Sequence, residues 1–225
     1  MRDMLSGDER RARLREARLY LVCGADGDGR DLAGFLAAAL RGGVDVVQLR
    51  EKDGNDEEIL RVAPIFRAAC DAHGALFVVN DWPDLAEEAG ADGVHIGQDD
   101  GPVDEARAIV GEDLLIGRST HTPAQVDVAT VADVDYFAVG PVHATPTKPG
   151  RPAVGPDLVR HAAARERGKP WFAIGGIDTE TVGDVVGAGA TRVVVVRALT
   201  EAADPEATAR TLRGALSLEA GVGPT

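Results

Sequence analysis

The sequence predicts an α/β fold consisting of a single (β/α)8 TIM barrel. From residue 19 onward, short β-branched apolar runs alternate with longer runs of helical character. Eight such pairs fill about 200 residues, the size of a minimal barrel of this type. With 225 residues, 44% of them hydrophobic, the chain can bury the core of one large domain. The alternative, a doubly wound open sheet, would have fewer strands and a G-x-G-x-x-G turn after the first, which residues 24–29 do not provide.

Each predicted strand is a short apolar run bounded by glycine, proline or polar residues. The eight strands expected are residues 19–23, 44–49, 76–80, 93–96, 114–117, 136–139, 171–174 and 192–196. The helices expected between and after them are residues 31–41, 56–73, 83–89, 103–110, 123–131, 156–167, 179–187 and 205–216. Proline interrupts the helical hydrogen-bond pattern, so a kink is expected at Pro64.

Outside the barrel, assigned to residues 18–218, the chain contributes only short segments. Residues 1–17 form a charged N-terminal extension without the apolar centre of a signal peptide, and residues 219–225 are expected to be a frayed tail. Cys23 and Cys70 show neither metal-ligand spacing nor a disulfide framework, and no apolar run is long enough to span a membrane. These features predict a cytoplasmic protein.

The formal net charge of −13 argues against a general nucleic-acid binder and against a membrane-surface binder. The partners expected are therefore small-molecule substrates, with no nucleic acid and no membrane. The sequence leaves open whether the chain forms a homo-oligomer.

The end of the second strand carries the first indication of a site. Gln48, Arg50 and Lys52 follow the apolar run at a period of two, so they project from one side. In a barrel, the carboxyl ends of all strands surround one mouth, where the chemistry takes place. An amide and two cations at this mouth predict an anion site, although a solvated strand end would show the same pattern.

Acidic residues follow two neighbouring strands. Asp81 comes after the third strand, and Asp99 and Asp100 come after the fourth, so their carboxylates can converge on one Mg²⁺ ion. Beside these carboxylates, Arg50, Lys52 and Lys148 match a diphosphate held through a metal. Most loop carboxylates and rim cations are merely solvated, so the prediction depends on their combination.

The last two strands end in a second candidate anion site. Gly175 and Gly176 follow the seventh strand, and Val196 and Arg197 end the eighth, where many barrels bind phosphate through open backbone N–H groups. Structural turn glycines are the equally ranked alternative.

The histidines give weaker signals. His121 is a lone loop histidine, more often structural than a general base, and Ser119 with His121 lacks the third member of a hydrolytic triad. His95, inside a strand, is expected to be packed or to support the site indirectly.

Taken together, six strand ends closely resemble thiamine-phosphate synthase, and the resemblance runs from about residue 19 to residue 213. The segments that carry it are QLREK at 48–52, Asn80-Asp81, GVHIGQDD at 93–100, Ser119-Thr120-His121, Gly140-Pro141 with TPTK at 145–148, and IGGI at 174–177. Each motif is weak alone, but the set is specific.

The resemblance implies that hydroxymethylpyrimidine diphosphate alkylates the nitrogen of hydroxyethylthiazole phosphate, giving thiamine phosphate and diphosphate. It implies Mg²⁺ as cofactor, with Asp81 and Asp100 as ligands; only the register of the motif selects Asp100 over Asp99. By position, the remaining roles fall to Gln48 for the aminopyrimidine, Arg50, Lys52, Asn80 and Lys148 for the diphosphate, Ser119 as a further contact to the pyrimidine diphosphate, and Thr145, Thr147, Gly176, Val196 and Arg197 for the thiazole phosphate. Arg50, Lys52, Lys148 and Ser119 are the catalytic candidates.

Two positions depart from the family pattern. Arg197 stands where the family often has serine, which is compatible with direct contact to the thiazole phosphate. His143 replaces a frequent aromatic residue, which leaves the conformation of the following loop open.

Three alternatives remain on the same scaffold. One is a thiazole tautomerase using His121 for proton transfer, and another is a non-catalytic regulator that binds thiazole phosphate or pyrimidine. A phosphate-binding barrel enzyme of tryptophan or histidine synthesis is the third. Lys52, the Asn80-Asp81 pair and Lys148 argue against the tautomerase, because an isomerase has no diphosphate to release.

Overall fold

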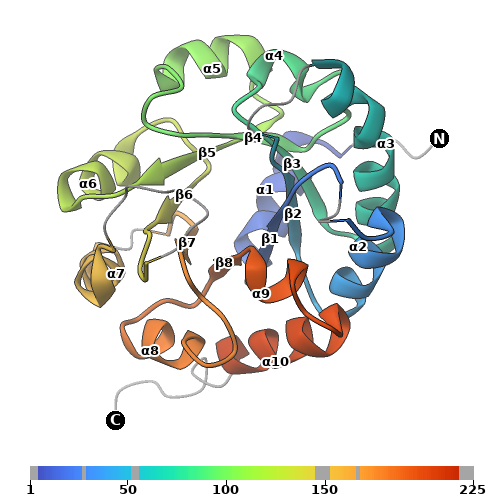
Figure 1. Ribbon diagram of the computed structural model, residues 1–225. Coiled ribbons are helices and arrows are strands. Elements are labelled where there is room, and N and C mark those ends of the chain that lie inside the picture. The colour runs from blue at the N-terminus through green and yellow to red at the C-terminus, as the bar shows by residue number, and fades with distance from the viewer. Residues whose placement is uncertain (1–4, 27–28, 52–55, 145–152, 166–167, 218–225) are drawn as a thin grey trace.

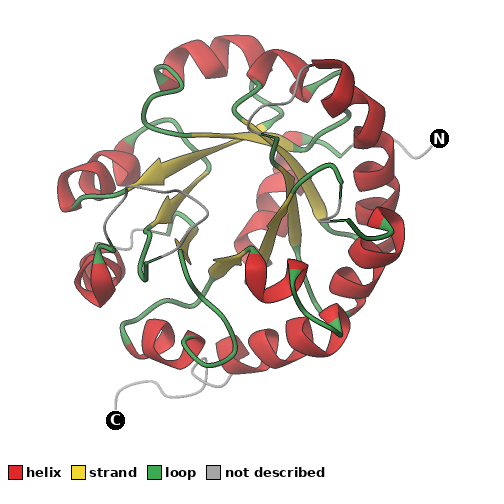
Figure 2. Cartoon of the chain, in the orientation of Figure 1, coloured by secondary structure: helices red, strands yellow, loops and turns green. Residues whose placement is uncertain are grey.

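The computed structural model describes residues 5–26, 29–51, 56–144, 153–165 and 168–217. Eight parallel strands close into a barrel in chain order, and most of the helices form a ring outside it (Figures 1 and 2). The predicted single (β/α)8 barrel is confirmed.

The strands are short and almost entirely buried, as expected for a parallel sheet covered by helices. They are β1 (Leu19–Cys23), β2 (Val46–Leu49), β3 (Leu76–Asn80), β4 (Gly93–Ile96), β5 (Leu115–Thr120), β6 (Tyr136–Val139), β7 (Trp171–Ile174) and β8 (Val193–Val195). The helices are α1 (Gly7–Glu16), α2 (Leu32–Arg41), α3 (Asp56–His73), α4 (Pro83–Ala86), α5 (Val103–Val110), α6 (Pro123–Val131), α7 (Gly155–Ala164), α8 (Val182–Gly187), α9 (Arg197–Thr200) and α10 (Pro205–Ser217).

Most predicted elements occur within a few residues of their expected bounds, with four informative differences. Strand β5 continues to Thr120, so Ser119 lies within the strand and not in the loop after it. Helix α3 continues on both sides of Pro64. Helices α1 and α9 were not predicted: α1 lacks an apolar face, and α9, with four residues, is too short to show a helical period.

The side chains form two apolar layers on opposite sides of the strands. One lies between strands and helices and includes Leu36, Phe66 and Leu212. The other fills the barrel interior, where Tyr20, Tyr136 and other strand residues pack. Side chains alternate along a strand, so the residue two positions after an interior apolar residue also faces the interior. It lies one step nearer the mouth of the barrel.

Helix α1 covers the end of the barrel opposite the mouth, behind the strands in Figure 1. Its Leu14 belongs to the interior cluster. A capping box formed by Ser6 and Glu9 fixes its start. The charged N-terminal segment is therefore part of the folded structure in its described portion, residues 5–17.

Aspartates that directly precede even-numbered strands tie this end together. Asp45, Asp92 and Asp135 each accept a hydrogen bond from a backbone N–H at or beside the start of the preceding odd-numbered strand. Each also pairs with arginine, and α1 supplies Arg10 to Asp92 and Arg11 to Asp135.

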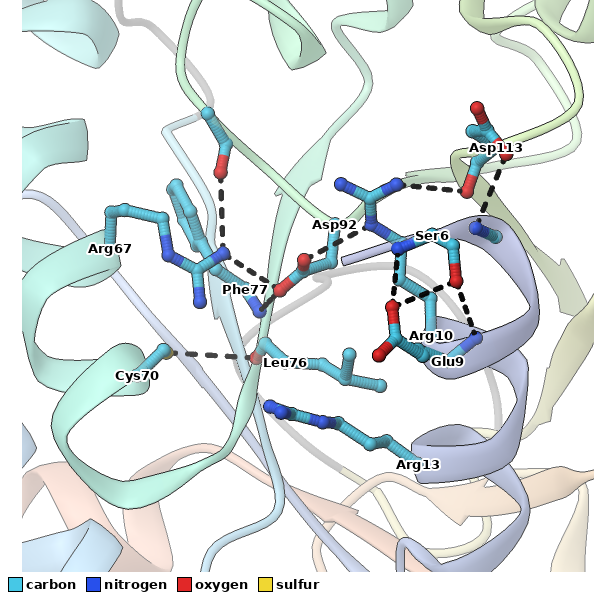
Figure 3. A network of polar contacts seen from close by, with 12 residues as sticks. Ser6, Glu9, Arg10, Arg13, Arg67, Cys70, Leu76, Phe77, Asp92 and Asp113 are labelled. Carbon is cyan, nitrogen blue, oxygen red and sulfur yellow. Dashed lines mark hydrogen bonds and ion pairs between the residues drawn. The ribbon is translucent and has the colours of Figure 1, made fainter. Parts of the chain in front are cut away.

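Asp92 is the most buried of the three carboxylates, since the side chains of Asp135 and Asp45 are 8% and 27% exposed. Figure 3 shows Asp92 with its partners. It accepts from Arg10 Nε at 3.2 Å, Arg67 Nη1 at 2.8 Å and the backbone N–H of Phe77 at 2.9 Å. Its side chain is 2% exposed and that of Arg10 is 3% exposed. This network stabilises the closed end of the barrel, which is the end opposite the mouth.

Within the described part of the chain, no helix has the length and apolar character needed to cross a membrane.

Candidate active site

At the mouth of the barrel, the last interior-facing residues of three strands are polar. Gln48 follows Val46 on β2, Asn80 follows Val78 on β3, and Ser119 follows Gly117 on β5. All three are buried, and all three line a pocket of about 230 Å³. The period-two pattern that first indicated an anion site therefore places Gln48 and Arg50 in the same pocket.

Arg50 brings positive charge to this pocket beside three carboxylates. Burial lowers the pKa of its guanidinium, and the negative charges of Asp81, Glu51 and Asp100 oppose that shift, Asp81 most strongly. Asp81 and Asp100, 19 positions apart in the sequence, thus lie within electrostatic reach of one cation.

The backbone of Asp81 is unusual, because its φ of 67° is the only positive value among the described non-glycine residues. Aspartate tolerates this left-handed conformation better than most residues. The Asp81 N–H donates to the carbonyl of His95 on the neighbouring strand, and its carboxylate accepts from the side-chain amide of Asn80. Conformation and hydrogen bonds together hold this carboxylate at the mouth.

The loop after β4 holds Asp100 in a compact turn. Its Oδ2 accepts the N–H of Gly97 at 2.6 Å. Arg118 donates to the carbonyls of Gly101 at 2.8 Å and Gln98 at 3.4 Å, and its charge interacts with Asp100 more strongly than with Asp99. Arg118, which the sequence analysis did not single out, thus fixes this loop from β5.

Among the described residues, no group of three or more His, Cys, Asp or Glu side chains could hold a metal by itself. Two carboxylates near one another suit Mg²⁺ when substrate phosphates and water complete its coordination. Asp81 and Asp100, which both act electrostatically on Arg50, fit that kind of shared site.

The opposite side of the pocket is formed after β7 and β8. Gly175 and Gly176 have φ values of 108° and 61°. A Cβ at Gly176 would lie 2.8 Å from Cβ of His143, so the close approach of the β6–α7 loop also requires glycine there. Val196 and Arg197 complete this side.

Two acidic residues on the same side were not expected. Asp178 and Glu201 line the pocket near Arg197. Hydrogen bonds from the Thr181 and Glu180 N–H groups and from the Thr181 hydroxyl outweigh burial and lower the pKa of the Asp178 carboxyl. Asp178 therefore caps the turn before α8, a role consistent with the helix-start signal in its Asp-Thr-Glu-Thr sequence.

His121 lines the pocket and is oriented by the chain itself. Its Nδ1 donates to the carbonyl of Gly140 at 2.6 Å, and its backbone N–H donates to Gln125 Oε1 at 2.7 Å. These bonds place the Nδ1 proton on the side of β6.

Comparisons with known proteins identify the family of this chain. The model of the thiamine monophosphate synthase family matches residues 19–199, which include all eight strands. The chain belongs to this family.

Curated relatives and a solved structure extend the likeness over nearly the whole chain. A thiamine-phosphate synthase of Mycolicibacterium smegmatis is 54% identical over 214 residues, covering 91% of this chain and 94% of the relative. One of Streptomyces avermitilis is 55% identical over 203 residues, covering 90% and 94%. The structure of a thiamine phosphate pyrophosphorylase from Pyrococcus furiosus has a TM-score of 0.80 at 26% identity, covering 91% of this chain and 97% of that one.

The structure thus brings nine of the residues expected from the thiamine-phosphate synthase pattern to the mouth of the barrel. Gln48, Arg50, Asn80, Ser119, Gly176, Val196 and Arg197 line the pocket, and Asp81 and Asp100 act on Arg50. The other four, Lys52, Thr145, Thr147 and Lys148, lie outside the described residues.

Proposed function

We infer that the chain catalyses the reaction of the thiamine-phosphate synthase family. The bond between the pyrimidine methylene carbon and the diphosphate oxygen breaks, and the same carbon bonds to the nitrogen of thiazole phosphate. Thiamine phosphate and diphosphate are the products. The observation that carries this inference is the convergence of Arg50, Asp81 and Asp100 with Gln48, Asn80 and Ser119 at one barrel mouth.

The pyrimidine side of the pocket supports a dissociative step. The ring amine can donate electrons into the methylene carbon, so the main barrier is departure of diphosphate. Arg50 and Asn80 lie where they can bind the departing oxygens. Asp81 and Asp100 would hold Mg²⁺, which when bound supplies positive charge to the leaving group.

The thiazole side requires orientation and not proton transfer. The thiazole nitrogen is neutral and attacks through its lone pair, so no general base is needed. Arg197 and the backbone at Gly176 and Val196 can bind the phosphate. This division of labour fits a pocket with Arg50, Asp81 and Asp100 at one side and the open backbone of Gly176 and Val196 beside Arg197 at the other.

A thiazole tautomerase is the second candidate, and the position of His121 favours it. His121 lines the pocket with its imidazole oriented by Gly140, as a proton-transfer group requires. Such an enzyme would have no use for the paired Asp81 and Asp100 beside Arg50.

Reactions that leave out one substrate or Mg²⁺ distinguish the synthase from the tautomerase and from a non-catalytic regulator that binds thiazole phosphate or pyrimidine. Purified protein is given pyrimidine diphosphate, thiazole phosphate, both or neither, with Mg²⁺ or excess chelator, and released diphosphate is measured. We expect release only with both substrates and Mg²⁺. Binding of thiazole phosphate without any release would support the regulator, and its isomerisation alone would support the tautomerase.

Asp100→Asn is expected to raise the Mg²⁺ concentration needed for half-maximal rate and to lower kcat by about tenfold or more, because it removes one of the two carboxylates proposed to bind Mg²⁺. The amide oxygen can still accept the Gly97 N–H, so the loop and the melting temperature should be nearly unchanged. The matched variant Asp99→Asn should retain the wild-type Mg²⁺ dependence. The reverse pattern in the two variants would assign the metal to Asp99.

A reducing cytoplasm is the compartment we propose for this reaction, because the chain's two cysteines, Cys23 and Cys70, are buried and their spacing gives no disulfide framework. Burial raises the pKa of the Cys70 thiol to about 12, which keeps it unreactive.

A further inference from the structure

A chain of four hydrogen bonds crosses the interior of the barrel below the pocket. Gln48 Nε2 donates to the Tyr20 hydroxyl at 2.7 Å, and the Tyr20 and Tyr136 hydroxyls lie 2.9 Å apart. The Tyr136 hydroxyl is 3.2 Å from His95 Nδ1, and His95 Nε2 is 3.0 Å from the Ser119 hydroxyl. Its two ends, Gln48 and Ser119, are pocket residues of β2 and β5.

The number of protons available determines the direction of these bonds. Burial raises the pKa of both tyrosines, so each hydroxyl carries its proton. Among the described residues, the Tyr20 hydroxyl contacts only Gln48 and Tyr136. Since Gln48 already donates to it, Tyr20 must donate to Tyr136, or its buried proton would have no acceptor.

The directions of the remaining hydrogen bonds follow from that step. The Tyr136 hydroxyl accepts from Tyr20, and among the described residues His95 Nδ1 is the acceptor left for its own buried proton, so Tyr136 donates to His95 Nδ1. The proton of the imidazole then lies on Nε2 and is donated to Ser119 Oγ. Ser119 keeps its own proton for the pocket, and Gln48 keeps its amide oxygen for it. Reversing one end requires reversing every bond between them.

We propose that Tyr20, Tyr136 and His95 are positioning residues that couple Gln48 to Ser119, so that the pocket offers an acceptor at Gln48 and a donor at Ser119. A 4-aminopyrimidine carries the complementary pair, an amino N–H beside a ring nitrogen. The inference rests on the proposed function, because it requires the pyrimidine ring to lie between these two side chains.

The surrounding packing is adapted to the chain. A Cβ added at Gly117 on β5 would lie 2.6 Å from His95 Nδ1 and still closer to the Tyr136 hydroxyl. Glycine at this position therefore leaves the space in which those two groups meet. The rings of Tyr20 and Tyr136 also pack edge-on against Phe172, which fixes their planes.

A double-mutant cycle between Tyr20→Phe and Ser119→Ala tests the coupling. Among the bonds described above, Tyr20 and Ser119 are joined only through Tyr136 and His95. If the two residues acted independently, the fold-loss in kcat/KM for pyrimidine diphosphate in the double variant would equal the product of the two single fold-losses within about twofold. We expect Tyr20→Phe alone to raise the KM for pyrimidine diphosphate by about tenfold, with the KM for thiazole phosphate unchanged. In the Ser119→Ala background, Tyr20→Phe should have at most about one third of that effect.

Thr120→Val is the matched control for loss of a buried hydroxyl on the same strand. The Thr120 hydroxyl donates to the carbonyl of Ala138 and takes no part in the series of hydrogen bonds from Gln48 to Ser119. Its effect should combine with Tyr20→Phe by simple multiplication. Multiplicative effects in the Tyr20–Ser119 cycle as well, with wild-type turnover intact, would overturn the coupling but leave the proposed function standing.

The protonation of His95 gives a readout independent of turnover. In ¹⁵N-labelled protein, the His95 ring, assigned by comparison with a His95→Gln variant, should show a protonated Nε2 and an unprotonated Nδ1. A proton on Nδ1 instead would overturn the proposed direction. Failure of wild-type protein to release diphosphate would contradict the proposed function and is distinguishable from both results.

Discussion

Asp81→Asn is expected to lower kcat for thiamine phosphate formation by about 10²–10³-fold, with little change in folding. The substitution removes the carboxylate with the largest favourable effect on Arg50 and, as we propose, half of the protein's Mg²⁺ ligands. Losses of this size are typical when one fixed charge that stabilises the transition state is removed. Single-turnover release of diphosphate over a range of Mg²⁺ concentrations measures the effect.

Asparagine suits this test because it tolerates the left-handed backbone at residue 81, where φ is 67°. Asp81→Ala is the informative comparison: it should lose as much activity and in addition destabilise the fold by about 1–2 kcal/mol, from backbone strain. Wild-type single-turnover rates in Asp81→Asn would remove Asp81 from the metal site.

Asp92→Ala is expected to destabilise the protein by about 3–5 kcal/mol, the usual result of removing one partner from a buried ion pair. Arg10, 3% exposed, would lose its carboxylate, and Arg67 and the Phe77 N–H would each lose an acceptor (Figure 3). The midpoint of urea unfolding measures the change. Substrate KM values in the folded fraction should stay as in wild type, because the network lies at the closed end.

Asp45→Ala is the control at the equivalent position before β2. Asp45 also accepts the backbone N–H groups of Arg18 and Leu19 at the start of β1 and pairs with Arg213, but its side chain is 27% exposed and that of Arg213 is 33% exposed. Water can replace much of what is lost, so we expect about 1–2 kcal/mol. Equal losses in the two variants would contradict the view that burial makes Asp92 critical.

Much of the fold could be predicted from sequence because parallel barrel strands are short, apolar and regularly spaced. The same alternation placed Gln48 and Arg50 on the pocket side of β2, as the structure shows. Elements without an apolar pattern were missed. Helix α1 is held mainly by arginines that reach Asp92 and Asp135 across the chain, and no local signal reveals such partners.

The candidate site was predicted unevenly for a similar reason. Residues that follow strands were found because barrel topology brings them together. Tyr20, Tyr136 and His95 lie within strands, where hydrophobic context indicates core, and their hydrogen bonds appear only once the strands are paired. Arg118 contacts backbone carbonyls of another loop, which sequence cannot indicate.

The most direct test of the proposed reaction is ³¹P NMR of wild-type protein with both substrates and Mg²⁺, combined with mass spectrometry of the products. We expect the resonances of pyrimidine diphosphate to be replaced by free diphosphate, while thiazole phosphate is converted to thiamine phosphate in a 1:1 ratio. Loss of the thiazole phosphate resonance with pyrimidine diphosphate intact would contradict the account and identify chemistry on the thiazole alone.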